Sequence, residues 1–558
     1  MASVRAVFRN CGFDRCNEIA EKQIEFEGQT GEFDDAFLRE NLLTLVEYTT
    51  SQTSGVPDHL KKKKIIFSMV RANPKGFISY LRKKFAQFDV RLGQLFHEDD
   101  YILRIVYCSY HPYDQNIRAV VNEPIYLDLP HLRYFEMLTG TIHMSASNEL
   151  FSFLDVSPHQ VARNGVLTAS NKTATHTGSI LPEKASGFPK GYKVVSFYVD
   201  AATLLERAYV LRRDGWRSTI HAYQRMLSRK KVEAIRKRLR NERRVFVNNI
   251  IATLPQNVRP EDSDGKTIDI ASLTMVAPVS IKLPDSANSI GLVDGQHRLY
   301  SYYETKGDDA EIKKLRHHQN LLVTGIIYPE GTSDPERERF EAELFLAINS
   351  NQTNAPTALR QEIEVLLKPN STTAIARRVL ERLAASGPLA GHVERHFYEK
   401  GKLKTSSIVS FALGPLVKLT GEDTIFKLFV HDQKADIDEG TADEALQAYV
   451  EFASTTINTF LGAIKKNIES SRWTPDSSIP GRILAVTYVN SFLILLRKLV
   501  EEGLPLDFET ISTKVENIND FKFKDYHSSQ YARMAKDLFD MYFSTSGTIQ
   551  VSDDSNAN

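Results

Sequence analysis

The sequence predicts an α/β protein that ends in a helical region. Short runs rich in β-branched and aromatic residues, such as 101–107 and 321–328, alternate with stretches whose apolar residues recur at helical spacing. Beyond Pro356 the spacing is helical almost to the end of the chain. A mixed α/β part followed by a helical part is therefore expected.

The length of the chain predicts several domains, because 558 residues exceed what one hydrophobic core usually serves. A stretch rich in Gly, Pro, Ser and Thr interrupts the regular pattern after about residue 160. We predict an N-terminal α/β domain over 1–160, a linker or long loop over 161–191, a central α/β domain over 192–365, a helical domain over 366–545 and a disordered tail over 546–558.

The first part of the N-terminal domain has apolar spacing that predicts helices. From Asp34 to about Phe88 the spacing is helical: residues such as Phe37, Leu42 and Val46 predict one helix, and Ile78, Leu81 and Phe85 predict a second. The four lysines of 61–64 are expected to lie on a solvated face. The pattern then changes to that of a strand over 101–107.

Charge is balanced over the whole chain but not locally. Lys plus Arg and Asp plus Glu each number 70, so no global basic field marks a nucleic-acid coat protein. Residues 225–244, however, carry ten Lys or Arg against two Glu. The stretch is either a solvated helix face or a polyanion-binding face, because such a density of like charge repels itself. The cations expected to face outward are Lys230, Lys231, Arg236, Lys237, Arg238 and Arg240.

Cysteine usage and hydropathy indicate a cytoplasmic protein. Three cysteines cannot form a disulfide framework, and the chain has no apolar run of 18 residues that could span a bilayer. No signal-peptide pattern is present at the N-terminus. We therefore expect a reduced cytosolic environment and no membrane partner.

One short motif, Asp294–Arg298, reads DGQHR. It follows the apolar run 290–293 and precedes residues with helical spacing, which predicts a strand-to-helix turn. Free N–H groups at the start of a helix attract anions, and Arg298 could fork onto a phosphate. The alternative is an ordinary capped helix with Asp294 as the N-cap.

Three elements in order resemble one family. Tyr223-Gln224-Arg225, the DGQHR motif and Phe345-Leu346-Ala347-Ile348-Asn349 with Gln352 are similar to those of the DGQHR-domain family, which includes DndB-like regulators of DNA phosphorothioate modification. The resemblance covers roughly residues 190–365 and implies a central domain with a ParB/sulfiredoxin-like fold. In that fold a turn at a helix start holds nucleotide phosphates. The residues it implies for phosphate or nucleotide binding are Asp294, Gly295, Gln296, His297, Arg298, Gln224, Arg225, Asn349 and Gln352.

The resemblance implies an accessory or regulatory protein of a prokaryotic DNA-modification or phage-defence system. Such a protein would bind DNA through the basic stretch and a nucleotide or phosphate at the turn. Partner proteins of the same operon and self-association are left open. One alternative is an ATP or CTP hydrolase in which Asp294 binds Mg²⁺ beside a nucleoside triphosphate and Arg298 stabilises the transferred phosphoryl group. A second is a non-catalytic scaffold for partner proteins.

Some relatives carry a restriction-endonuclease-like domain at the N-terminus. Its chemistry needs an Asp on one strand and Glu-x-Lys on the next. Asp89 precedes the predicted strand 101–107, but Tyr107-Cys108-Ser109 stands where Glu-x-Lys is required. We therefore expect a degenerate domain without DNA cleavage. His392 and His396 have helical spacing but no third ligand, so no metal site is predicted.

Overall fold

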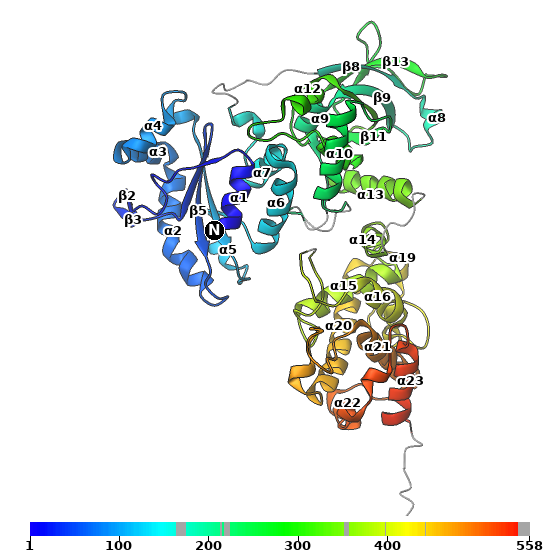
Figure 1. Ribbon diagram of the computed structural model, residues 1–558. Coiled ribbons are helices and arrows are strands. Elements are labelled where there is room, and N and C mark those ends of the chain that lie inside the picture. Colours follow the sequence, from blue (N-terminus) through cyan, green and yellow to red (C-terminus); the bar gives the residue numbers. More distant parts are fainter. Residues whose placement is uncertain are drawn as a thin grey trace, which may run out of the picture. The chain divides into compact units, whose positions relative to one another are not determined.

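The computed structural model describes residues 1–162, 174–212, 215–216, 224–350, 357–396, 398–440 and 442–544. The chain divides into two compact units, Met1–Phe345 and Leu346–Asn558. The first unit holds the sheets and the second holds helices (Figure 1). The predicted class, mixed α/β with a helical C-terminal region, is thus confirmed. The predicted tail lies outside the described residues.

The N-terminal part of the first unit is built on a five-stranded sheet in the order β1-β4-β5-β6-β7. Strands β4 and β5 form an antiparallel hairpin, whereas β5, β6 and β7 are parallel. A separate hairpin, β2–β3, lies beside the sheet. The strands are β1 (Asp14–Arg15), β2 (Ile24–Phe26), β3 (Gln29–Gly31), β4 (Asp35–Arg39), β5 (Leu42–Thr49), β6 (Ile102–Ser109) and β7 (Ile125–Tyr126).

Helices cover both faces of this sheet (Figure 1). One face, with Leu43 and Leu45 of β5, packs in a core with α2–α4, and the other, with Leu42 and Val46, packs with α1 and α6. Alternate residues of a strand point to opposite faces, so β5 is buried along its whole length. The helices are α1 (Ala2–Asn10), α2 (Val56–Ala72), α3 (Pro74–Lys84), α4 (Ala86–Leu92), α5 (Ile117–Val120), α6 (Leu129–Ile142) and α7 (Ser147–Phe153).

The helix expected from residue 34 onward is wrong over its first part, which forms β4 and β5. Because β5 is buried on both faces, its apolar residues run continuously and lack the alternation that reveals a half-exposed strand. The later helix is correct, since 78 and 81 lie in α3. Asp89 lies on α4 and pairs with Arg82, its Oδ1 2.6 Å from the guanidinium Nε.

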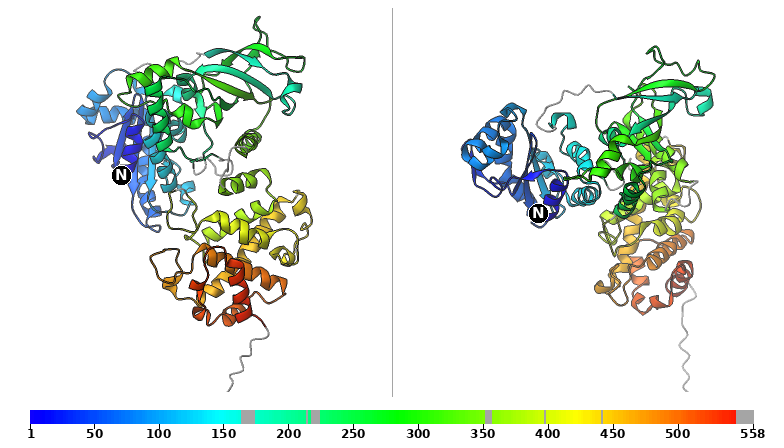
Figure 2. Two further views of the ribbon diagram at one scale, coloured as in Figure 1. Left: turned by 45° about the vertical axis from the view of Figure 1, so that its right-hand side comes forward. Right: turned by 45° about the horizontal axis from the view of Figure 1, so that its top comes forward.

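The central part of the first unit is a curled eight-stranded sheet in the order β10-β14-β11-β15-β9-β8-β13-β12. Two further views show the curled strands from other sides (Figure 2). Strand β11 lies between β14 and β15, antiparallel to the first and parallel to the second. The strands are β8 (Ala174–Ile180), β9 (Lys193–Asp200), β10 (Ala208–Tyr209), β11 (Ile250–Leu254), β12 (Pro260–Glu261), β13 (Ala277–Leu283), β14 (Ile290–Asp294) and β15 (Asn320–Ile327).

Several helices accompany this sheet: α8 (Glu183–Ser186), α9 (Ala201–Arg207), α10 (Arg229–Glu242), α11 (Gln296–Tyr300), α12 (Ala310–His318) and α13 (Asp334–Ser350). Part of the stretch predicted as a linker is regular, because β8 pairs with β9 and β13 there. The strands that the sequence predicts at 249–254, 289–293 and 321–328 correspond to β11, β14 and β15.

The described residues of the second unit form helices around one apolar core and no named strand. The two longest, α20 and α21, contribute much of that core. The helices are α14 (Thr357–Leu367), α15 (Thr372–Ala385), α16 (Thr405–Ile408), α17 (Gly414–Val417), α18 (Ile425–Leu428), α19 (Asp436–Glu439), α20 (Asp443–Lys466), α21 (Val486–Glu501), α22 (Phe508–Lys514) and α23 (Tyr531–Tyr542).

Candidate functional site: the DGQHR turn and the basic helix

The DGQHR motif stands at the predicted strand-to-helix turn, where β14 ends at Asp294 and α11 begins at Gln296. Gly295 between them has φ +98°, a left-handed conformation that side chains other than glycine rarely adopt. A Cβ at this position would lie 3.0 Å from Ile250 Cγ1 on the neighbouring strand. The turn therefore requires glycine for its conformation and for its packing.

Asp294 and Arg298 form an ion pair across the turn. Arg298 Nη2 donates to Asp294 Oδ2 at 2.8 Å and to the carbonyl oxygen of Asn249 at 2.9 Å. Asn249 immediately precedes β11, so the arginine joins the ends of two neighbouring strands. Its Nε is buried and has no hydrogen-bond partner among the described residues. Arg298 thus uses part of its hydrogen-bonding capacity and keeps part unused.

His297 connects the turn to the basic helix α10. Its Nε2 accepts the backbone N–H of Ser228 at 3.1 Å, and Ser228 is the N-cap of α10. Burial, together with the nearby charge of Lys231, lowers the pKa of His297 to about 4. At neutral pH the imidazole is therefore uncharged, and only its Nδ1 can donate. Contact of a protonated His297 with a phosphate does not agree with this geometry.

The second predicted element adjoins the same turn. Gln224 is buried, and its side-chain amide donates to the carbonyl oxygen of Leu292 on β14. The carbonyl oxygen of Arg225 accepts from Gln296 Nε2 at 3.3 Å. Gln296 Oε1 is buried without a hydrogen-bond partner among the described residues. Gln224 and Arg225 are thus next to the motif, and the amide of Gln224 is engaged by the backbone.

The structure adds a residue that the sequence did not single out. Arg212 is 3% exposed, its Nη1 lies 2.9 Å from Glu149 Oε2, and its guanidinium lies 5.3 Å from the ring centroid of Tyr300 on α11. Its Nε and Nη2 have no partner among the described residues. The arginine follows an apolar run, 208–211, and nothing in its local pattern distinguishes it from a surface residue.

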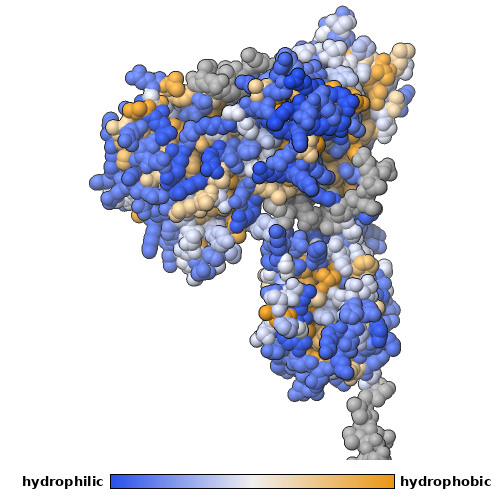
Figure 3. Space-filling view, in the orientation of Figure 1, coloured by the Kyte–Doolittle hydropathy of each residue, from blue (hydrophilic) through white to orange (hydrophobic). Residues whose placement is uncertain are grey.

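The predicted outward-facing cations of the basic helix α10 fall into three groups. Arg238 pairs with Glu242 at 2.9 Å, and Arg240 pairs with Asp309 at 2.6 Å. The lysines Lys230, Lys231 and Lys237 are exposed, and no carboxylate of the described residues pairs with them. In Figure 3 a deep blue, hydrophilic area covers the region where Figure 1 shows α10 and α12.

Arg236 forms the third group, and its predicted exposure is wrong, because the side chain is 7% exposed. It stacks on Tyr303 with 3.9 Å between guanidinium and ring centroid. Its Nη1 donates to the carbonyl oxygens of Ser301 and Tyr303, at 3.1 and 2.7 Å. A planar guanidinium can be buried where backbone carbonyls accept its hydrogen bonds and an aromatic ring stacks on it. The spacing of apolar residues in the sequence does not reveal such a site.

The site residues of the third predicted element lie in the second unit or outside the described residues. Asn349 is near the end of α13 and belongs to the second unit, whereas the motif belongs to the first. Gln352 lies outside the described residues. A three-sided pocket that includes these two residues stays a prediction.

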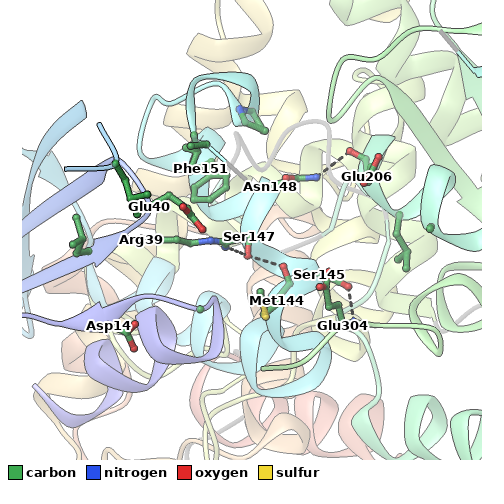
Figure 4. A pocket seen from close by; sticks show the side chains of 18 of the residues that line it. Asp14, Arg39, Glu40, Met144, Ser145, Ser147, Asn148, Phe151, Glu206 and Glu304 are labelled. Carbon is green, nitrogen blue, oxygen red and sulfur yellow. Dashed lines mark hydrogen bonds between the residues drawn. The ribbon is translucent and has the colours of Figure 1, made fainter. Parts of the chain in front are cut away.

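The first unit has a cavity of about 580 Å³ away from the motif, lined from β4, α7 and α12 (Figure 4). Arg39 donates to Ser147 at its wall, and Asn148 donates to the carbonyl oxygen of Glu206 at 2.9 Å. No residue of the motif lines it. Its arginines and lysines equal its carboxylates in number, so it offers no excess positive charge to a polyanion: Arg39, Arg91, Lys313 and Arg316 face Asp14, Glu40, Glu206 and Glu304.

Comparisons with family models, with curated proteins and with solved structures found no match. Among the described residues, each helix is too short or too polar to span a membrane. In the same residues, no three side chains of His, Cys, Asp or Glu converge as ligands for one metal ion.

Proposed function

We propose that the chain is a DGQHR-domain accessory or regulatory protein of a prokaryotic DNA-modification or defence system. Its central domain would have the ParB/sulfiredoxin-like fold that the resemblance implies. It binds DNA through α10 and a phosphate, of a nucleotide or of the DNA, at the DGQHR turn. The ordered motif elements and the position of the motif between β14 and α11 support this proposal.

The observation that carries the proposal is the set of unpaired lysines next to the turn. Lys230, Lys231 and Lys237 share one helix with few carboxylates, and Ser228 at its start is bonded to His297 of the motif. Like charges at this density repel each other, and a phosphate backbone would neutralise them while the counterions condensed on the DNA are released. DNA is therefore a favoured partner of this face.

The turn itself offers a smaller set of groups to a phosphate. The first intrahelical bond of α11 runs from Leu299 N–H to the carbonyl oxygen of Gly295 at 3.0 Å, so the N–H groups before it have no acceptor within the helix. The unpartnered Nε of Arg298 lies at the same turn. These donors would bind one phosphate group. The larger ligand to be tested is a nucleoside triphosphate with Mg²⁺.

A nucleotide hydrolase is the weaker alternative. Such an enzyme would need Asp294 as a metal ligand, but Asp294 Oδ2 already accepts a hydrogen bond from Arg298 Nη2 at 2.8 Å. Both residues would have to exchange this ion pair for ligand contacts. Binding without turnover requires no such exchange, so a regulatory role agrees better with the geometry.

DNA binding is tested by charge reversal on α10. Lys230→Glu, Lys231→Glu and Lys237→Glu are combined, and binding of a 30-base-pair duplex is measured by fluorescence anisotropy. The matched control is Lys61→Glu, Lys62→Glu and Lys83→Glu, which makes the same change in net charge on exposed lysines of α2 and α3. We expect the first variant to lose at least about 100-fold in affinity and the control less than about threefold. Equal losses in both variants would disprove the proposed face.

A further inference from the structure

Strand β6 leaves half of one edge open in the N-terminal part of the first unit. On one side it pairs with β5 along its whole length, from Ile102 to Ser109. On the other side it pairs with β7 only through Val106 and Tyr107. Residues 102–105 therefore have no neighbouring strand on that side among the described residues. Such an edge presents backbone groups with which another chain can pair.

Two backbone N–H groups point to this open edge. Ile102 donates its N–H at 2.8 Å to the carbonyl oxygen of Asn41, the residue before β5, so its backbone groups face β5. Successive residues of a strand direct their backbone groups to opposite neighbours, so those of Leu103 and Ile105 face away from β5. No described residue accepts either N–H. Ile105 is nevertheless only 4% exposed, and a buried N–H without an acceptor is rare in a native fold.

A cavity of about 600 Å³ follows the open edge. Five consecutive residues, 101–105, line it, which shows that the strand edge itself forms the wall, because a sheet face would contribute only every second side chain. Arg71 and Pro74, near the junction of α2 and α3, also line the cavity, as do Asp155 and Gln160 after α7. The cavity therefore lies where a further strand of the sheet would lie, and its volume is in the range of ligand sites.

Arg104 blocks the carbonyl group of this edge but not its N–H groups. Its Nη1 donates to the carbonyl oxygen of Leu103 at 3.0 Å. Its Nε and Nη2 donate to the carbonyl oxygens of Leu154 and Asp155, at 2.9 and 2.7 Å. Charged side chains commonly protect an exposed strand edge from other chains. Because the N–H groups of Leu103 and Ile105 stay open, a chain that pairs here must bring carbonyl oxygens.

Two carboxylates at the cavity lack a cation. Glu123 Oε1 accepts the hydroxyl of Ser68, whereas Glu123 Oε2 is buried and has no hydrogen-bond partner among the described residues. In the same residues no Lys, Arg or His pairs with the carboxylate of Asp155. Arg71 instead donates through Nη1 to the carbonyl oxygens of Asn122 and Glu123, at 2.8 and 3.2 Å. An unpaired oxygen of a buried carboxylate costs free energy, so the cavity favours a ligand with a positive charge.

We propose that the open edge of β6 binds an extended segment of a partner protein, and that a lysine or arginine of this segment pairs with Glu123. The segment adds a strand beside residues 102–105, and two of its carbonyl oxygens accept the N–H groups of Leu103 and Ile105. At about 3.3 Å for each residue, this edge takes a segment of roughly 13 Å. In this mode of recognition the main-chain bonds give affinity, and the side chains give specificity.

The proposed site is separate from the DNA-binding residues. The residues that line the cavity include none of the DGQHR motif and none of the three lysines of α10. Its unpaired side-chain groups are carboxylate oxygens, which repel a polyanion. The inference thus goes beyond DNA binding and uses other residues, so either proposal can fail while the other holds.

The test uses the full chain and three blocked, fluorescein-labelled hexapeptides of alternating threonine and valine, in which one central residue is lysine, glutamine or glutamate. Binding is measured by fluorescence anisotropy. Leu103→Pro is the main variant, because proline removes an N–H that faces the open edge and none that faces β5. Glu123→Gln removes the charge and keeps an acceptor for Ser68. Glu25→Gln, an exposed carboxylate on β2, is the matched control.

We expect the wild type to bind the lysine peptide at least about tenfold more tightly than the glutamate peptide. Glu123→Gln should bind all three peptides with affinities within about threefold of each other, whereas Glu25→Gln should behave as the wild type does. Leu103→Pro should bind none of them. In the wild type, the lysine peptide should slow hydrogen exchange of the Leu103 and Ile105 N–H groups by at least about tenfold.

The absence of saturable binding to any of the three peptides overturns the proposal. Equal affinity of the wild type for the lysine and glutamate peptides overturns the role of Glu123. Unchanged hydrogen exchange at Leu103 and Ile105 overturns the added strand, and this measurement decides even where Leu103→Pro fails to fold. A dimer in sedimentation that dissociates in Leu103→Pro, with no peptide bound, would assign the edge to a second copy of the chain and contradict the proposal.

Discussion

The DGQHR turn and the polar cluster of Asp34, Glu47 and Lys63 at α2 differ in how many of their polar groups already have protein partners. At the turn, His297 accepts a backbone N–H, and Arg298 pairs with Asp294 and a strand carbonyl. In the cluster, Glu47 Oε1 pairs with Lys63 at 2.8 Å, whereas its buried Oε2 has no hydrogen-bond partner among the described residues. A recognisable motif can thus serve the fold with most of its side chains. Unsatisfied charge lies in a stretch whose sequence pattern did not even predict its strands.

The comparison leads to a rule that substitutions can test. Removing a polar group that is satisfied within the protein should reduce stability, whereas removing one that is unsatisfied should leave stability unchanged or raise it. The free energy of unfolding of the first unit can be followed by Trp216 fluorescence in urea. A Trp473→Phe background removes the tryptophan of the second unit.

The largest effect is expected for Arg236→Met. The substitution removes two bonds to backbone carbonyls and the stack on Tyr303, and it leaves Asp308 with Arg316 as its remaining cation. We expect a loss of about 3 kcal/mol in unfolding free energy. Arg238→Met on the same helix removes only an exposed pair and should cost less than about 0.5 kcal/mol. Similar costs for both variants would contradict the buried role of Arg236.

Gly295→Ala should cost roughly 1–2 kcal/mol, because alanine at φ +98° is strained and its Cβ would crowd Ile250. Gly265→Ala is the control, since it has φ +79° and open space around a Cβ. It carries the backbone strain without the crowding. The difference between the two urea midpoints measures the close approach at the turn, and no difference would show that packing there is loose.

Protonation of His297 should weaken the link between the turn and α10. Because the folded-state pKa is lowered to about 4, below the usual 6.5, the unfolded chain binds the proton first as pH falls. Its contribution to stability is present above pH 6.5 and is lost as pH falls toward 4. His297→Gln should flatten this part of the pH profile of the urea midpoint. The same profile in His297→Gln and in the exposed control His318→Gln would refute the assignment.

The smallest expected effect has the opposite sign. Asp34→Asn should raise the unfolding free energy by about 0.5 kcal/mol, because burial and the nearby charge of Glu47 disfavour the ionised Asp34 carboxyl. Since the pKa of Asp34 is raised, this gain should be present at neutral pH and shrink as acid protonates the wild-type carboxyl. A clear loss of stability would mean that Asp34 is satisfied in the folded chain.

The sequence predicted the elements around the motif better than the roles of its side chains. A short apolar run predicted β14, which is buried on both faces, and helical spacing after the motif predicted α11. Neither pattern could predict that His297 would accept from Ser228, a contact between residues 69 positions apart. Burial of Arg236 depended on Tyr303, again a distant partner. Strand β5 was missed because a strand buried on both faces has no alternating pattern.

The salt dependence of DNA binding tests the central claim most directly. The slope of log affinity against log salt concentration counts the phosphate contacts that the protein makes, at about 0.9 for each contact on duplex DNA. Replacing Lys230, Lys231 and Lys237 by glutamine should reduce the slope by about 3. An unchanged slope in this variant would contradict the account, because the lysines of α10 would then make no contact with DNA.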